Sequence, residues 1–237
     1  MKKTAALLIS ILALAAFAGA DYYVKAKTHA DALSAMGQSQ PAKDDMQEQW
    51  IGTDRFANIT PEMSILIDLK KSEAVFINHS SQTYTPASLP LDMAKLLPPQ
   101  YAQMAALMKM SAAVKPLGTT KKIGSWTCQG YDVTITMMMT VSMTVWASTD
   151  VPFDGSLVMD KYMSRVFQGT MMLDEASLAE MKKIKGYWIA SETIIDMMGS
   201  KMRSTMEVVE ISQKNPPAEV FKIPQGYAQS DTLVMMR

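Results

Sequence analysis

The feature that most constrains the fold is a long run of strict alternation between Tyr131 and Val145. Odd-numbered positions in this run are apolar, and the even-numbered ones are mostly Thr, Ser or Asp. A period of two places each set on its own face of a pleated strand, so the run predicts β structure with one apolar face. A single strand of this length would span roughly 50 Å, which exceeds the usual length of a strand.

We therefore expect a hairpin within this run. The alternation keeps the same parity along its whole length, whereas a two-residue loop would change it. The turn is thus predicted to contain an odd number of residues, such as Met138–Thr140. This placement lacks the Gly or Asn that a tight hairpin turn favours.

The first twenty residues have the features of a secretory signal peptide. Lys2 and Lys3 precede an apolar run, and Ala18-Gly19-Ala20 fits a cleavage site. The apolar run is shorter than the ~20 residues that a transmembrane helix requires. We expect residues 1–20 to be removed and residues 21–237 to form one domain in the periplasm or outside the cell. No segment of that mature chain is long and apolar enough to span a bilayer.

The net charge argues against one class of function, and the cysteine count decides whether a disulfide can form. Without Lys2 and Lys3 the 23 basic residues fall to 21, against 23 acidic ones. A nearly neutral chain without basic clusters argues against binding to nucleic acid. Cys128 is the only cysteine, so no intramolecular disulfide can form. With Trp126 and Tyr131 close by, Cys128 is predicted to be a small buried hydrophobe rather than a reactive thiol.

The order of predicted elements is strands, helices, strands, helices and strands. Strands are expected at Asp21–Thr28, Gln47–Asn58, Ser64–Asp68, Ala74–His79, Thr83–Thr85, Tyr187–Met197 and Lys201–Gln213, and helices at Leu91–Leu97, from Pro99, at Ser156–Gln168 and at Asp174–Ile184. Residues 30–45 are expected to form a loop or weak helical turn, and residues 114–124 a connection. This order predicts an α+β domain with a curved antiparallel sheet and helices packed on one side.

No arrangement of residues in the sequence supports catalysis. His29 and His79 stand alone, each at the end of a strand-like segment, and are expected to be exposed or hydrogen-bonded rather than catalytic. Motifs for metal, nucleotide or hydrolase sites are absent from the sequence. We therefore expect a protein that is not an enzyme and that uses no cofactor or metal.

Methionine is unusually frequent, with 23 residues, several of them adjacent. Thioether ligands suit Cu(I), but adjacent methionines on a strand face opposite ways and no His or Cys lies between them. Ordinary filling of the core by a flexible side chain is another interpretation. We favour a third one, in which methionines of the central hairpin, the last hairpin and the helix from Pro99 line a pliable apolar cavity.

Four segments carry a resemblance to a known family: QWIGTDRF (Gln49–Phe56), ILIDLKKSEAVFINHSSQTYT (Ile65–Thr85), KKIGSWTCQGYDV (Lys121–Val133) and FKIPQGY (Phe221–Tyr227). With the signal peptide, they resemble the LolA/LolB-like superfamily of periplasmic lipoprotein carriers, and more closely an uncharacterised secreted bacterial family similar to it. The resemblance implies an unclosed β-barrel, with helices over its mouth and inner face and a cavity for acyl chains. It also implies that Arg55 contacts the helical lid.

Together these observations predict a carrier or binding protein for a hydrophobic ligand, either lipid or the acyl chains of a lipoprotein. The residues expected to line its cavity are Met104, Leu107, Met108, Val133, Ile135, Met137, Met143, Val145, Met202 and Met206. The alternative is a structural or partner-binding domain in which the same residues form a dry core. The sequence does not predict the oligomeric state.

Overall fold

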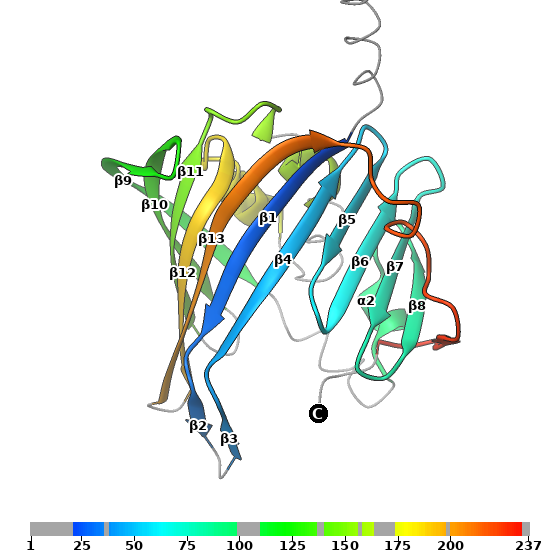
Figure 1. The fold of residues 1–237 in the computed structure, drawn as a ribbon. Helices are drawn as coiled ribbons and strands as arrows, with labels where there is room; N and C mark the ends of the chain where they lie inside the picture. The colour runs from blue at the N-terminus through cyan, green and yellow to red at the C-terminus, as the bar shows by residue number, and fades with distance from the viewer. Residues whose placement is uncertain are drawn as a thin grey trace, which may run out of the picture.

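The computed structural model describes residues 21–35, 38–98, 110–136, 140–155, 158–163, 174–197 and 200–233. In these ranges the chain is mostly β, and twelve strands form one mixed sheet that does not close (Figure 1). The helices of the described residues are short: α2 (Met93–Leu96), the π-helix η1 (Val158–Met163) and α6 (Glu175–Met181). None of them is long and apolar enough to cross a membrane.

The N-terminal strand β1 (Asp21–Ala30) joins two antiparallel meanders. On one side of it lie β4 (Lys43–Ile51), β5 (Arg55–Ile59), β6 (Met63–Asp68), β7 (Glu73–Asn78) and β8 (Thr83–Ser88). On the other side lie β13 (Ser200–Lys214), β12 (Tyr187–Met197), β11 (Thr140–Ser148), β10 (Trp126–Thr136) and β9 (Ser111–Ile123). The short β14 (Ala228–Gln229) pairs with β8 in parallel, so the sheet differs from the fully antiparallel one expected from the sequence.

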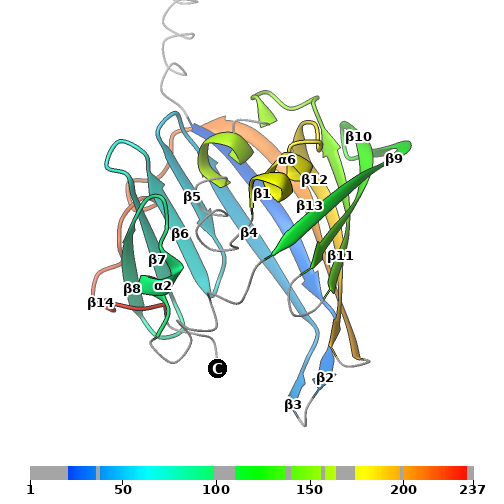
Figure 2. The same cartoon turned by 180° about the vertical axis from the view of Figure 1, so that it is seen from behind.

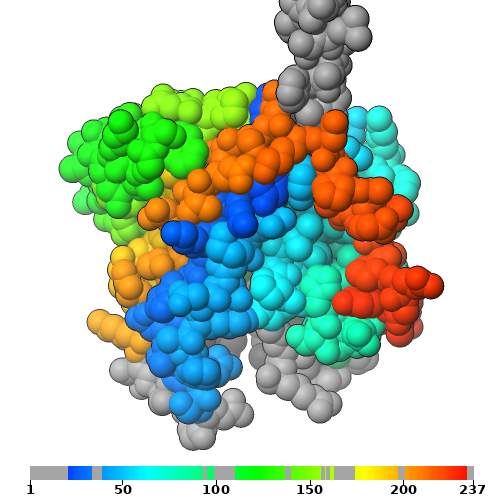
Figure 3. Space-filling view, viewed as in Figure 1, coloured from blue at the N-terminus to red at the C-terminus, as the bar shows by residue number. Residues whose placement is uncertain are grey.

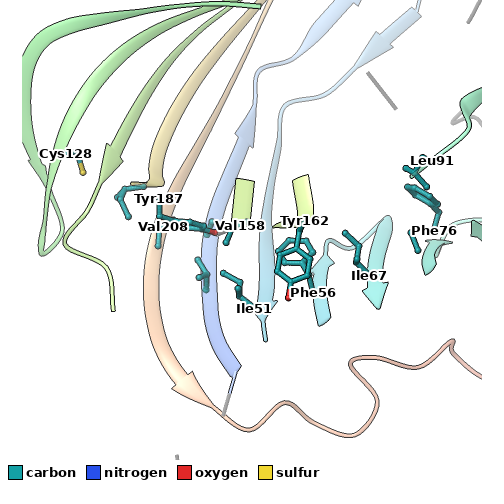
Figure 4. Close-up of a cluster of buried hydrophobic side chains, with 14 of the residues drawn as sticks. Ile51, Phe56, Ile67, Phe76, Leu91, Cys128, Val158, Tyr162, Tyr187 and Val208 are labelled. Atoms are coloured by element: carbon teal, nitrogen blue, oxygen red, sulfur yellow. The ribbon is translucent and has the colours of Figure 1, made fainter. Parts of the chain in front are cut away.

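The sheet is strongly curved, and η1 and α6 lie on its concave side (Figures 1 and 2). We call this side the inner face. Alternate residues of β1, β4, β5, β6 and β7 point to it and form a buried cluster with η1 (Figure 4). The predicted curved, unclosed sheet is thus confirmed, whereas the predicted α+β class is not, because the described residues are mostly β and their helices are short.

The outer face of the same strands is covered by the C-terminal segment that follows β13. Tyr23, Trp50 and Leu66 form a cluster there with Phe221 and Tyr227. Figure 3 shows this segment, coloured orange to red, lying against the blue and cyan strands. The β1–β8 half of the molecule therefore has three layers: the C-terminal segment, the sheet and the inner helices.

The predicted central hairpin is formed by β10 and β11. Val133 pairs with Met143, and Thr136 with Thr140. Three residues, 137–139, connect the strands, which confirms an odd count and moves the turn one residue earlier than Met138–Thr140. The connection itself, with Met137, lies outside the described residues.

Two stretches expected to lack regular structure are strands. In the first, β1 continues to Ala30, and β2 (Leu33–Ala35) and β3 (Gln38–Gln40) form a small separate hairpin. Its short, polar strands have no apolar alternation that would reveal them. The second is β9, which contains Pro116. Proline is tolerated there because β9 is an edge strand that pairs only with β10.

Candidate functional site

A cavity of about 610 Å³ lies between the inner face of the sheet and the segments that carry η1 and α6. Its volume is in the usual range for ligand sites, ~300–1,000 Å³. Most of its wall is apolar. The apolar residues of the wall are Val24, Ala26, Phe56, Val158, Met181, Ile184, Met206 and Val208.

The floor of the cavity is built where β1 meets β13. The register between these strands shifts between Lys25 and Ala26, so that Ala26 pairs with Val208. Val24 and Val208 are each only 2% exposed. Because alanine is the smallest side chain on this floor, it leaves space above the sheet that a larger apolar residue would fill.

One wall of the cavity carries a ladder of polar side chains. The Tyr187 hydroxyl donates a hydrogen bond to Oε1 of Gln49. The amides of Gln49 and Gln47 both donate to Oδ1 of Asn58, the former at 3.1 Å. Burial raises the pKa of Tyr187, which keeps the phenol neutral and able to donate. Each glutamine amide has a second N–H, so the ladder can offer further donors to a polar group of a ligand.

The rim of the cavity includes the turn between α6 and β12. Asp174 caps the N-terminus of α6 by accepting a hydrogen bond from the Ser177 amide at 2.8 Å. Lys182 and Lys185 follow α6, line the cavity and are exposed. Gly186 ends the turn at φ +91°, and a Cβ there would lie 2.2 Å from the Ser148 carbonyl oxygen. Only glycine lets the backbone approach so closely.

Helix α6 also protects the open edge of the sheet. The backbone N–H groups of Ala112 and Val114 on β9 donate to Ser177 Oγ at 3.0 Å and to Glu180 Oε2 at 2.9 Å. Hydrogen bonds from Lys183 and from Val114 lower the pKa of Glu180, so this carboxylate stays ionised as an acceptor. The two hydrogen bonds hold α6 in position over the inner face of β9 and β10.

The π-helix η1 is held by the turn between β4 and β5. Tyr162 is fully buried, and its hydroxyl donates to the Gly52 carbonyl at 2.7 Å. Its ring stacks on Phe56, with centroids 5.4 Å apart (Figure 4). Burial, together with the charges of Asp54 and Asp21, raises the pKa of Tyr162 to about 12. These contacts place Val158, one turn earlier on η1, over the cavity.

A second, smaller cavity of about 260 Å³ continues along the inner face of β1, β12 and β13. It shares Ser191 and Met206 with the first cavity. Its wall is richer in hydroxyl groups: Thr28, Thr193, Ser204 and Thr205 line it. The inner face therefore changes from apolar to polar along these strands.

The residues predicted to line a cavity all face inward where the structure describes them. Val133, Ile135 and Val145 are buried in a cluster with α6, and Met143 packs against the edge of that cluster. Met206 lines both cavities, whereas Met202 is half-buried beside Ile195. Met104, Leu107, Met108 and Met137 lie outside the described residues. A ligand-binding role for this set stays a prediction.

Arg55, the predicted lid contact, has its described partners on the outer side of the sheet. Its Nε donates to Asp21 Oδ2 at 3.0 Å, and its guanidinium lies 4.5 Å from the centre of the Phe221 ring. The neighbouring Gly52 and Thr53 carbonyls bind η1 through Tyr162 and Lys161. Arg55 therefore belongs to the turn that holds η1, and direct contact with a lid stays a prediction.

Potential catalytic groups have structural partners. His79 lies 2.8 Å from Ser64 Oγ, but that serine is only 4% exposed, which places its hydroxyl out of reach of a substrate. His29 is exposed and lies between Asp31 and Asp44. Cys128 is fully buried, as predicted, and burial raises the pKa of its thiol. Among the described residues, no group of three His, Cys, Asp or Glu side chains could hold a metal ion.

Sequence reasoning missed the polar ladder and the rim lysines. Gln47 and Gln49 alternate with Ile51, which faces inward, so two polar residues occupy inward positions of a strand. That is a detectable signal of a polar site on an apolar face. Their partners Asn58 and Tyr187 come from other strands, and only the fold brings them together.

Comparison with solved structures finds two similar folds of low sequence identity. One is a LolA superfamily protein from Nitrosomonas europaea, with 10% identity, a TM-score of 0.30, and coverage of 87% of this chain and 91% of that chain. The other is a DUF1329 family protein from Desulfovibrio piger, with 8% identity, a TM-score of 0.30, and coverage of 92% and 96%.

No curated protein matches the sequence. A family model does match, over residues 27–227, and its description is "Domain of unknown function (DUF4412)". These residues run from within β1 to the turn before β14, and include every residue that lines the cavity except Val24 and Ala26. The chain belongs to the DUF4412 family.

Proposed function

We propose that the protein is a non-catalytic carrier or binding protein that holds the apolar part of a lipid or of an acylated protein in the 610 Å³ cavity. The observation that carries this proposal is an apolar cavity between sheet and helices whose wall also has a few convergent polar groups. The signal peptide expected at residues 1–20 supports a site of action in the periplasm or outside the cell.

Energetics bound the affinity for a single acyl chain. Burying about ten methylenes contributes roughly 8 kcal/mol before any cost of association. Loss of translational and rotational freedom removes several kcal/mol of that gain. We therefore expect dissociation constants no tighter than micromolar, which suits a carrier that must also release its ligand.

The first experiment is native mass spectrometry of the secreted protein, purified without denaturation, together with extraction of bound lipid. A co-purifying lipid or acylated peptide in near-stoichiometric amount supports the proposal and identifies the ligand class. An apo mass that stays unshifted after lipid is added contradicts it. That outcome would favour a dry core and a function in binding protein partners.

Variants of β13 test the location of the site. Met206→Asp places a charge in the cavity and should weaken binding of a fluorescent fatty acid at least tenfold, because the carboxylate must be desolvated beside the chain. Val209→Asp is the matched control, since Val209 is 38% exposed on the same strand and is absent from the cavity wall. It should bind as the wild type does.

A second variant keeps this test decisive if Met206→Asp disturbs folding. Ser191 lies between the two cavities, so Ser191→Trp should fill the space with an apolar group and block the ligand. Circular dichroism and the urea midpoint show whether each variant is folded. A folded Ser191→Trp protein with unchanged affinity would place the ligand elsewhere.

A further inference from the structure

The charge lining the large cavity has one sign. Lys182 and Lys185 belong to its wall, and no Asp or Glu occurs among the described residues that line it. Both lysines sit in the turn between α6 and β12. Nζ of Lys185 donates to the Lys182 carbonyl at 3.3 Å, which holds its ammonium group against this turn. The intervening Lys183 pairs with Glu180, and it is not among the residues that line the cavity.

The two lysines and the apolar floor of the cavity differ in their exposure to solvent. Both lysines are exposed, whereas Val24, Phe56 and Val208 in the same wall are at most 2% exposed. A ligand that fills the cavity therefore meets buried apolar side chains along its length and ammonium groups where it reaches solvent. That is the pattern of an amphiphile with a polar head at the rim.

The volume of the cavity decides how large such an amphiphile can be. At roughly 30 Å³ for each water-sized group, 610 Å³ holds about 20 non-hydrogen atoms. One acyl chain with a small headgroup has this size. A lipid with two long chains has about twice as many atoms or more, and its second chain would remain outside.

We propose that the preferred ligand is a single-chain amphiphile with an anionic headgroup, with the headgroup beside Lys182 and Lys185 and the chain over the floor of β1 and β13. This inference rests on the proposed function, because it specifies the ligand of the same cavity. The anionic group gains two nearby cations and meets no opposing carboxylate in the described wall. A neutral ligand with the same chain gains only the apolar contacts.

The test compares cis-parinaric acid, a single-chain fatty acid that fluoresces without an attached label, with its methyl ester, which has the same chain and no charge. Wild-type protein should bind the acid about fivefold to tenfold more tightly at low ionic strength. Because the lysines are exposed, salt should screen the interaction. The ratio of acid affinity to ester affinity should therefore fall toward one in concentrated salt. The double variant Lys182→Gln/Lys185→Gln should bind both probes equally, with ester affinity unchanged.

The matched control is Lys122→Gln/Lys183→Gln, which removes the same net charge at positions outside the cavity wall. It should keep the preference for the acid. Two results would contradict the proposal that the ligand has an anionic headgroup: equal binding of acid and ester by wild type, or a preserved preference for the acid in the Lys182/Lys185 variant. Either result leaves the proposed binding function of the cavity intact. Failure of wild type to bind either probe contradicts the proposed function, and this inference with it.

Discussion

Two histidines in this protein occupy opposite electrostatic environments. His29 is exposed, with Nδ1 2.7 Å from Asp44 and Nε2 3.0 Å from Asp31, and these carboxylates raise its pKa above 6.5. His79 lies between Ser64 and Tyr227, and burial lowers its pKa below 6.5. The same side chain therefore prefers the charged form at one site and the neutral form at the other.

The two sites are predicted to give opposite pH dependences of stability. For His79, the unfolded chain binds more protons than the folded one, so its contribution is present above pH 6.5 and is lost as pH falls through the lowered pKa. For His29, the contribution is complete below pH 6.5 and is lost as pH rises through the raised pKa. Urea unfolding of His79→Gln and His29→Gln between pH 5 and pH 8 measures both effects. This range brackets about 6.5, the pKa of an unperturbed histidine.

Relative to wild type, His79→Gln should lose less stability on acidification, and His29→Gln should be weakened mainly at acidic pH. Each variant serves as the control for the other, because both remove one imidazole. Parallel pH profiles for the two variants would contradict the environments described here.

At the scale of the element, Tyr162 holds η1 through one hydrogen bond and one aromatic contact, and Lys161 adds a hydrogen bond to the Thr53 carbonyl. Tyr162→Phe removes the hydroxyl that donates to Gly52 but keeps the ring on Phe56. Loss of this buried hydrogen bond should lower the free energy of unfolding by about 1–2 kcal/mol. Since η1 carries Val158 over the cavity, affinity for an acyl probe should fall as well. Urea titrations and probe binding measure the two effects.

Tyr84→Phe is the control for this change. The Tyr84 hydroxyl donates to Gln229 at 3.2 Å at the exposed edge of the sheet, so its removal should cost little. If both Tyr→Phe variants have equal stability, the Tyr162–Gly52 bond does not anchor η1.

Elements with a clear period could be predicted from the sequence, and those without one could not. The alternation from Tyr131 to Val145 predicted β10, β11 and the odd-numbered turn. β9 escaped prediction because Pro116 and three lysines interrupt its pattern, although pairing with β10 and hydrogen bonds to α6 stabilise it as a strand. At Pro224–Tyr227 the structure has Gly226 at φ +87° in the third position, which indicates a type II turn.

At the scale of the whole molecule, the sheet separates two apolar faces with different roles. The inner face carries the cavity, and the outer face is covered by the C-terminal segment. The existence of an apolar inner face was predictable from the alternation. The polar ladder and the rim lysines were not, because Gln49 and Tyr187 are 138 residues apart and meet only through the sheet.

Because the faces are separate, stability can be changed from outside without changing binding. Phe221→Ala removes a ring that covers the outer cluster and contacts Arg55. We expect the free energy of unfolding to fall by about 1.5–3 kcal/mol, from lost apolar burial and the cation–π contact. Probe affinity should remain that of wild type. Lys222→Ala, at an exposed neighbour paired only with Glu219 among described residues, should leave both quantities unchanged.

A loss of probe affinity in Phe221→Ala, measured below its unfolding transition, would show that the two faces are coupled. Unchanged stability would show that packing of Phe221 against the sheet contributes little to the free energy of unfolding. Urea titration followed by binding measurements in the folded range distinguishes these outcomes.

The pairing of β1 with β13 has a kinetic consequence. Ala26 and Val208 lie side by side in the floor of the cavity, yet the ribosome makes Val208 long after Ala26. A nascent chain that ends before β13 lacks the floor of the cavity and therefore has no site for a ligand. Joining the two strands also closes the longest loop in the sheet, a step that is slow in chains dominated by distant contacts. Any ligand can therefore enter this cavity only after β13 has been made and has paired with β1, so the cavity is empty when its floor first forms.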